Sequence, residues 1–507
     1  MMRKLVAASV IGALLTGTAN ADLNSATAAF EQKDFPAAAA EYTRLAIQGD
    51  SAAQYNLALM MANGQTGKRD LEAALGWSLA AQDNGLEQAT GIVEQLRRLL
   101  SPLQVEQAQQ YVARYGQAAL KPTAQMLLAT SLDAPLTVQR LGRSIYPDSA
   151  VREGTIGWVK QFFIVDADGR VRDNWTTQSI PPGTFIRTLS SELGDTRFAP
   201  PTVDGKAVAT LSVFLQKFTV GGESALDRPK LIRWLKELRS DADQGKTEAQ
   251  TILGIFGLAY PELSRTIGAS DDIGKPYVTA VDWLSKAASA VNHSAQFELG
   301  SDQLLGSITG GPERGIKTLM RAAMNGSGEA ALLLAMVSQS EATLDGEIRA
   351  LRWLRGAAKS GYGPATKRLA NLLASSDHIE VRDAMEAENQ IKRLRESALF
   401  SGDPDVWQIS AAAAAGRGDF KAAMQFEDKA ISEAKRLEWR IEPLQSRRRA
   451  YETNTTIGGL VLPNPVTYAT MQLEPKPGSD RDANGSVVIH ACSETASTGS
   501  YIPSCGH

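Results

Sequence analysis

Aromatic and small residues recur along much of the chain in one repeating frame. An aromatic residue is followed by Ala four positions on, Gly eight positions on and Ala twelve positions on, as in Trp77, Ala81, Gly85 and Ala89. A spacing of four places the aromatic residue and the first Ala on one face of a helix, the Gly ends that helix, and the second Ala begins the next. The frame therefore predicts helical hairpins that pack closely through their small residues.

The frame has a period of 35 residues. Trp283 and Trp353 lie 70 residues apart, the frame occurs again midway at Thr318, and Tyr42 lies 35 residues before Trp77. The further positions of the frame are Ala322, Gly326 and Ala330 after Thr318, Ala357, Gly361 and Ala365 after Trp353, and Ala46 and Gly49 after Tyr42. Such a period is typical of a repeat array in which each hairpin packs on its neighbours.

These units resemble the Sel-one-like repeats, which are relatives of the tetratricopeptide repeats. The segments that carry the resemblance are 80–85 (AAQDNG), 283–288 (WLSKAA) and 353–362 (WLRGAAKSGY). The resemblance covers residues 22–118 and 228–400, and it implies an α-solenoid of stacked helical hairpins. An insertion at 260–272 leaves the register of the hairpin before Trp283 open.

The end of the chain differs from these units. Residues 404–453 resemble a tetratricopeptide hairpin, in which Asp419 would cap the second helix and Phe420 would pack back on it. Beyond residue 453 the composition shifts to Gly, Ser, Pro and Asn. We therefore expect 454–507 to be an irregular tail with a short strand at 486–489.

Between the two helical parts, residues 141–222 change to an alternating pattern. Two strands are expected: the first ends at Val165 and the second begins at Val171. The turn sequence 166–170 (DADGR) joins them. Phe185 and Leu189 then recur at helical spacing, and 208–220 is expected to form the last strand. The chain is therefore predicted to be mainly α, an α-solenoid with one inserted small α+β domain of order β-β-α-β, preceded by a linker at 119–140.

The inserted segment resembles the C-terminal domain of the TonB energy-transducer family over its whole length. The residues that carry the resemblance are Tyr146, Pro147, Ala150, Gly154, Gly157, Trp158, Val159, Phe163, Val165, Asp166, Asp168, Gly169, Arg170, Val171, Ser179, Pro182, Gly183, Phe185, Phe198, Pro200, Gly205, Lys206, Val208 and Phe218. In that family the domain lies in the periplasm and contacts outer-membrane receptors by adding a strand at an exposed sheet edge. The resemblance implies a partner-binding edge at Val208, Leu211, Phe214, Gln216 and Phe218.

The N-terminus departs from that family, whose transducers keep a membrane helix and a long Pro-rich linker. Here residues 1–21 combine Arg3 and Lys4, an apolar run, and a small-residue cleavage site that ends at Ala21. This pattern predicts a cleaved secretory signal, a periplasmic location in a bacterium, and no stable membrane span after cleavage. An uncleaved anchor is the alternative, although the apolar run is short for a bilayer.

Composition narrows the possible functions. The 507 residues include 53 basic and 56 acidic side chains, which excludes a strongly basic nucleic-acid binder. The two cysteines, Cys492 and Cys505, are too few for a disulfide-rich scaffold or a paired-cysteine zinc site. In an oxidising compartment they can pair and close a short loop; free thiols in a tail are the alternative.

No motif indicates catalysis, so we expect no catalytic, cofactor-binding or metal site. The histidines are too scattered for a metal set: His293, His378, His490 and His507. The 166–170 turn resembles part of a calcium loop, but Arg170 stands where an oxygen side chain is needed and Thr177 stands where a Glu is needed, so the turn interpretation is preferred. Trp158 and Trp175 are interpreted as core residues, with anchoring of a partner as the alternative.

The favoured hypothesis is a non-enzymatic periplasmic interaction scaffold. Solenoid grooves and the strand edge would bind envelope proteins, including an outer-membrane receptor or a peptide segment, and no nucleic acid. The alternative is an accessory or divergent energy transducer in TonB-dependent transport across the outer membrane. A cell-envelope enzyme is the third hypothesis.

Overall fold

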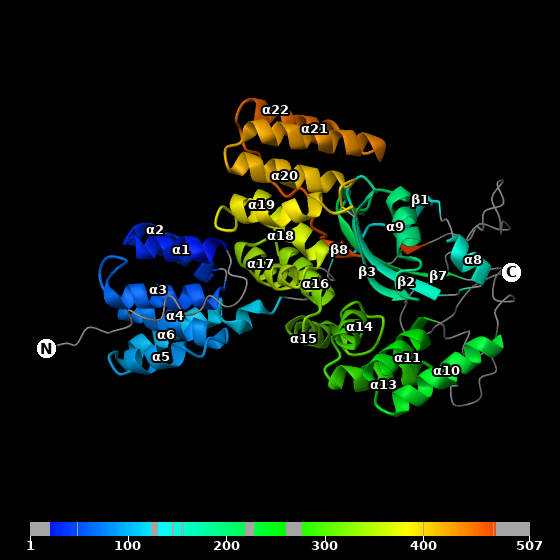
Figure 1. Ribbon diagram of the computed structural model, residues 1–507, viewed down its shortest axis with the longest axis horizontal. Coiled ribbons are helices and arrows are strands. Elements are labelled where there is room, and N and C mark those ends of the chain that lie inside the picture. The colour runs from blue at the N-terminus through cyan, green and yellow to red at the C-terminus, as the bar shows by residue number, and fades with distance from the viewer. Residues whose placement is uncertain are drawn as a thin grey trace.

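The computed structural model describes residues 21–47, 49–122, 130–143, 147–153, 155, 157–218, 228–259, 276–398, 400–469 and 471–472. Figure 1 shows two blocks of paired helices and one sheet that lies beside the second block. Residues 1–20 of the expected signal, the expected strand at 486–489, Cys492, Cys505, His490 and His507 lie outside the described residues. Within the described ranges, no helix combines the length and the apolar composition that crossing a bilayer requires.

The first block is a series of antiparallel helices. They are α1 (Ala21–Glu31), α2 (Phe35–Ile47), α3 (Ser51–Asn63), α4 (Leu71–Asp83), α5 (Ala89–Arg97), α6 (Pro102–Tyr115) and the 3-10 helix η1 (Gln117–Leu120). Trp77 lies in α4 and stacks on Tyr115 with ring centroids 4.6 Å apart. Gly85 follows α4 with a φ of 90°, and α5 begins at Ala89. The predicted frame is confirmed in this block.

The second block continues the same architecture through the C-terminal hairpin. Its helices are α10 (Arg228–Asp243), α11 (Thr247–Ala259), α13 (Pro276–Ser289), α14 (His293–Leu304), α15 (Gly311–Met324), α16 (Gly328–Gln339), α17 (Leu344–Lys359), α18 (Gly363–Ser375), α19 (Ala384–Arg395), α20 (Pro404–Gly416), α21 (Phe420–Arg436) and α22 (Glu442–Glu452). Side-chain caps begin several of them; Asp419 caps α21 by accepting the Ala422 N–H, as predicted. The chain is an α-solenoid with one inserted α+β domain.

The inserted domain has the predicted order β-β-α-β. Its main elements are β2 (Gly157–Val165), β3 (Val171–Ile180), α9 (Ile186–Asp195) and β7 (Thr210–Phe218). Smaller elements are β1 (Leu136–Arg140), α8 (Asp148–Glu153), β4 (Arg197–Phe198), β5 (Thr202–Val203) and β6 (Lys206–Ala207). Since β1 pairs with β4, the end of the expected linker 119–140 belongs to the sheet structure instead.

Residues beyond 453 are not wholly irregular, which corrects the prediction for the tail. They form β8 (Thr467–Tyr468), which adds to β7, and β9 (Met471–Gln472), which adds to β1. The main sheet therefore has the strand order β3-β2-β7-β8. The tail approaches the sheet along α18, where the side-chain oxygen of Asn371 accepts the backbone N–H groups of Val461 and Leu462 at 2.9 and 3.1 Å.

The sheet buries both of its faces. One face packs on α9 through a core that includes Val159, Phe163 and Phe214. The other face packs on the solenoid, where Phe162 and Trp175 share an apolar cluster with residues of α14 to α18. Trp158 and Trp175 are each 2% exposed, so the prediction that they are core residues is confirmed. Burial on both faces explains why β2 is covered along its whole length.

Charged side chains also cross from the sheet to the solenoid. Lys160 of β2 contacts Asp302 and Glu298 of α14 at 2.9 and 3.0 Å. Burial alone would lower the pKa of Lys160, but these two carboxylates raise it overall. Further along the array, Asp173 of β3 binds Lys367 and Arg368 of α18 at 2.8 and 3.2 Å. In Figure 1 the sheet accordingly lies between α10–α14 below and α18–α22 above.

Removal of the Lys160 ammonium is expected to destabilise the docked sheet. The variant Lys160→Met leaves Glu298 and Asp302 buried without a counter-charge, which is expected to lower the free energy of unfolding by about 3–5 kcal/mol. Urea denaturation followed by Trp fluorescence measures the loss. Lys121→Met is the control, because Lys121 pairs with Glu313 at the surface and is expected to contribute less than about 1 kcal/mol. Equal stability of the two variants would contradict the role of Lys160.

Loss of the Asn371 acceptor is expected to release the tail. In Asn371→Leu two buried N–H groups lose their partner, so limited proteolysis is expected to cleave between residues 454 and 472 roughly tenfold faster than in the unaltered chain. Mass spectrometry of the fragments locates the cut. Thr366→Val is the control, since the Thr366 hydroxyl donates to the Tyr362 carbonyl at the start of α18 and does not contact Asn371. An unchanged cleavage rate in Asn371→Leu would show that this contact does not hold the tail.

Candidate functional site

The expected partner edge on the last strand is partly occupied by this chain itself. β7 pairs with β2 along its whole length, and on its other side β8 pairs in parallel with Thr210 and Leu211. The edge is thus not free at Leu211, which corrects the prediction there, because the tail returns to the sheet. The side chains of Leu211, Phe214, Gln216 and Phe218 are all buried. Val208 precedes β7, and its N–H donates to the Pro201 carbonyl.

The outer side of β3 is a second sheet edge. In the part of the chain that the structure describes, β3 pairs only with β2, apart from a single bridge between Arg170 and Arg197 before the strand begins. Residues 176–180 of β3 are half-buried. Their polar sequence, TTQS followed by Ile, is typical of an edge strand, and this signal was available in the sequence although the resemblance pointed to β7.

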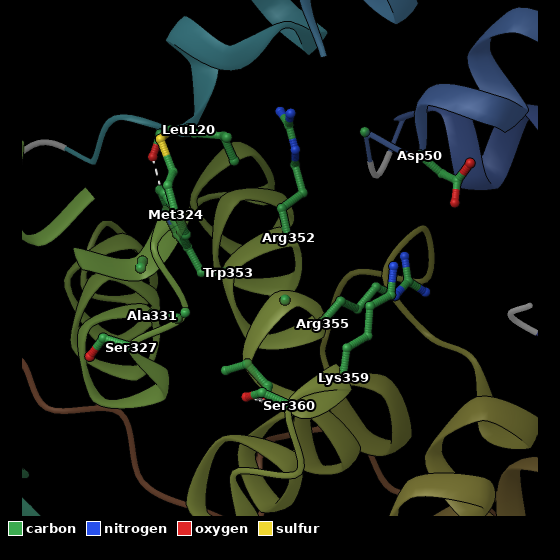
Figure 2. A pocket seen from close by; sticks show the side chains of 15 residues that line it. Asp50, Leu120, Met324, Ser327, Ala331, Arg352, Trp353, Arg355, Lys359 and Ser360 are labelled. Carbon is green, nitrogen blue, oxygen red and sulfur yellow. Dashed lines mark hydrogen bonds between the residues drawn. The ribbon is translucent and has the colours of Figure 1, made fainter. Parts of the chain in front are cut away.

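A pocket of about 350 Å³ lies at the junction of the two helical blocks. Figure 2 shows side chains from both blocks around it. The first block contributes Gly49 and Asp50 from the turn before α3, and η1 contributes Leu120. The opposite wall comes from α15 to α17 and includes Met324 and Trp353. The Trp353 indole N–H donates to the Leu120 carbonyl at 3.1 Å, which ties η1 to the second block.

Basic side chains of α17 line this pocket. Arg352, Arg355 and Lys359 are spaced three and four residues apart, which places them along one face of the helix. Arg355 forms an ion pair with Glu386. Arg352 crosses to the first block and donates to neutral acceptors there, the Gly116 carbonyl at 3.1 Å and the Asn84 side chain at 2.6 Å. The spacing is visible in the sequence, but the pocket depends on residues about 300 positions away and could not be predicted from it.

The titratable and nucleophilic side chains do not converge on a catalytic arrangement. Among the described residues, no group of three or more His, Cys, Asp or Glu side chains could hold a metal ion. His378 is half-buried, and its Nδ1 lies 3.0 Å from a Glu347 carboxylate oxygen. The Ser376 hydroxyl also donates to Glu347, so the carboxylate separates the serine from the histidine. In the 166–170 turn, Asp166 accepts the N–H groups of Asp168 and Arg170.

One carboxyl group has a strongly altered pKa in the C-terminal hairpin. Burial raises the pKa of Glu427 on α21 to about 8, and the nearby Arg447 only partly opposes this. Neither carboxyl oxygen has a hydrogen-bond partner among the described residues. Burial, with a contribution from Glu427, also raises the pKa of Tyr451 to about 12. Glu427 is fully buried, which suits a neutral packing role better than contact with a substrate.

Substitution of Glu427 is expected to change the pH dependence of stability. Its pKa in the folded chain lies above the ordinary value of 4.5, so folding loses stability as pH rises from about 4.5 through about 8. Glu427→Gln is therefore expected to match the unaltered chain near pH 4 and to be more stable by roughly 2–4 kcal/mol at pH 9. Denaturation at both pH values tests this. The control Glu433→Gln is expected to show no such gain, because Arg436 lowers the pKa of Glu433.

Comparison with known proteins gives partial likenesses. No family model matches the chain. The chain is 32% identical over 77 residues to the protein TonB of Pseudomonas aeruginosa, which corresponds to 15% of this chain and 22% of that protein. The similarity to TonB therefore concerns one segment, and the chain spans only about a fifth of the length of that relative.

Two solved structures are similar in part. One is a Sel1 repeat protein from Oxalobacter formigenes, with 22% identity, a TM-score of 0.32, and coverage of 46% of this chain and 66% of that one. The other is c5321, a protective antigen of uropathogenic Escherichia coli strains with an SLR fold, with 14% identity, a TM-score of 0.29, and coverage of 82% of this chain and 76% of that one.

Proposed function

We propose that this chain is a non-enzymatic protein-interaction scaffold of the bacterial periplasm. The helical array holds the small sheet rigidly, and the sheet offers a strand edge to an extended segment of an envelope protein. The observation that carries this proposal is the outer side of β3, which has no strand neighbour from Val171 to Ile180 among the described residues. Such an edge presents backbone N–H and C=O groups that an added strand can satisfy.

Rigidity of β3 supports strand addition, because an edge that is already ordered loses little entropy on binding. Asp173 is anchored to α18 by two cations, and Trp175 is buried against Phe162 with ring centroids 5.6 Å apart. The sheet thus holds β3 in place without help from the partner. On β7, the predicted edge beyond Leu211 stays part of the proposal as a second docking position.

The periplasmic location rests on the sequence. Arg3 and Lys4, the apolar run and the small-residue site at Ala19 and Ala21 have the order of a secretory signal. The segment similar to TonB fits a role in the cell envelope. Pairing of Cys492 with Cys505 belongs to the same proposal, because the periplasm is an oxidising compartment.

A second candidate function is an accessory role in TonB-dependent transport. The 32% identity to TonB over 77 residues favours it. N-terminal sequencing of the mature protein separates the possibilities: a start near Asp22 leaves an accessory role, whereas retention of residues 1–21 keeps a membrane anchor and with it a transducer-like role.

A photo-crosslinking residue at Thr177 tests the scaffold function directly. Thr177 lies on β3, and we expect the probe to capture one discrete envelope protein in intact periplasm. The matched probe at Gln109 is expected to capture none, because Gln109 is exposed on α6, which lies in the first block away from the sheet (Figure 1). Capture of the same protein at both positions, or of nothing specific at Thr177, would overturn strand addition at β3.

A further inference from the structure

Gly356, in the last turn of α17, has no close packing contact that requires glycine. A Cβ atom added to Gly356 would meet no atom within 4 Å, whereas at Gly76 it would lie 2.3 Å from Tyr111 and at Gly254 2.6 Å from Leu284. Glycine inside a helix is destabilising by about 0.5–1 kcal/mol relative to alanine. Close helix packing explains Gly76 and Gly254. At Gly356 the missing side chain instead leaves space in the junction pocket, which Gly356 lines.

The charges around this space are not balanced. Among the lining residues, Asp50 is the single acidic one, and one of its oxygens accepts the Ala53 N–H to cap α3. Among the described residues, the hydrogen-bond partners of Arg352 are neutral; burial lowers its pKa to about 10, and the nearby Asp83 only partly opposes this. Lys359 is exposed and forms no ion pair in the described part of the chain. Arg355 is neutralised by Glu386, but Arg352 and Lys359, two turns apart on α17, leave an excess of positive charge at the pocket that a bound anion would reduce.

The remaining wall is apolar. Trp353 is buried beside the pocket with its indole N–H already bonded to Leu120, so its ring offers carbon surface. Met324 is 55% exposed, so its side chain is accessible to a ligand at the edge of the cavity. A ligand that fits both walls must therefore carry an anionic group close to an apolar one. A volume of about 350 Å³ is at the small end of ligand pockets.

We propose that the junction pocket binds a carboxylate of a partner peptide together with a neighbouring apolar side chain. Lys359 and Arg352 attract the carboxylate, and Trp353 and Met324 contact the apolar side chain. Figure 2 shows the basic side chains of α17 on the side that faces Asp50 and the first block. The site goes beyond strand addition, because it lies on α15 to α17 and does not involve β3. A peptide bound there contacts both helical blocks.

Fluorescence anisotropy with three labelled heptapeptides tests the proposal on the full chain. The first is Gly-Ser-Leu-Asp-Leu-Ser-Gly amide, the second has Asn in place of Asp, and the third is the Asn peptide with a free carboxyl terminus. The Asp peptide is expected to bind about tenfold more tightly than the Asn amide, the effect of one charge-assisted hydrogen bond, and to weaken as salt is raised. Tight binding of the third peptide as well would identify a terminal carboxylate as a further source of the group.

Three substitutions separate binding from folding. Gly356→Leu fills the pocket and is expected to abolish binding without lowering the thermal midpoint. Gly91→Leu is the matched control on α5, because a Cβ there also meets no atom within 4 Å and Gly91 does not line the pocket. Lys359→Ala is expected to reduce the preference for the Asp peptide severalfold. Any of three results would overturn the proposal. The Asp and Asn amides could bind equally well, no peptide could bind up to millimolar concentration, or Gly91→Leu could lose binding as Gly356→Leu does. The Thr177 crosslink is independent of all three variants.

Discussion

The position of the sheet on the array depends on buried charges that are neutralised in only one register. Lys160 faces two acids of α14, and Asp173 faces two cations of α18. Leaving a buried ion unpaired costs several kcal/mol, which is more than a buried pair usually contributes to stability. A shift of one residue along a strand would turn these side chains to the opposite face, where α9 and its apolar core lie. The ion pairs therefore select the docked arrangement, and the apolar cluster around Phe162 supplies most of its stability.

This arrangement changes where a partner can bind. An α-solenoid commonly offers its inner surface to other proteins. Here the apolar side chains of α14 to α18 share a core with the sheet, so much of that surface is occupied from within the chain. The two positions proposed for partners are instead a sheet edge and the junction of the two helical blocks. One is suited to extended backbone, the other to a charged side chain, so they differ in what they recognise.

Local patterns predicted the repeats because each hairpin is stabilised by its own helix ends and neighbours. Trp77, Gly85 and Ala89 occupy in the structure the roles that their spacing assigns. Contacts across long stretches of sequence could not be predicted in this way. From the sequence, Arg368 resembles an ordinary exposed helix cation. In the structure it is fully buried and binds Asp173, which lies 195 positions earlier and could not be recognised as its partner from local patterns. The pairing of β8 with β7 was also missed. It too joins distant parts of the chain, and a strand of two residues leaves no alternating pattern to detect.

The return of the tail to the sheet also determines when this chain can finish folding. The hydroxyl of Thr467 bonds to the Thr130 carbonyl across 337 positions, and β8 completes a sheet whose other strands end at Phe218. Helical hairpins made of local contacts form quickly, whereas pairings of such large sequence separation form slowly. The hairpins can assemble as the chain emerges, but the β7–β8 pairing waits until residues 467–468 have been synthesised. A chain truncated before residue 460 would thus retain its repeats while the edge of β7 stayed open to aggregation.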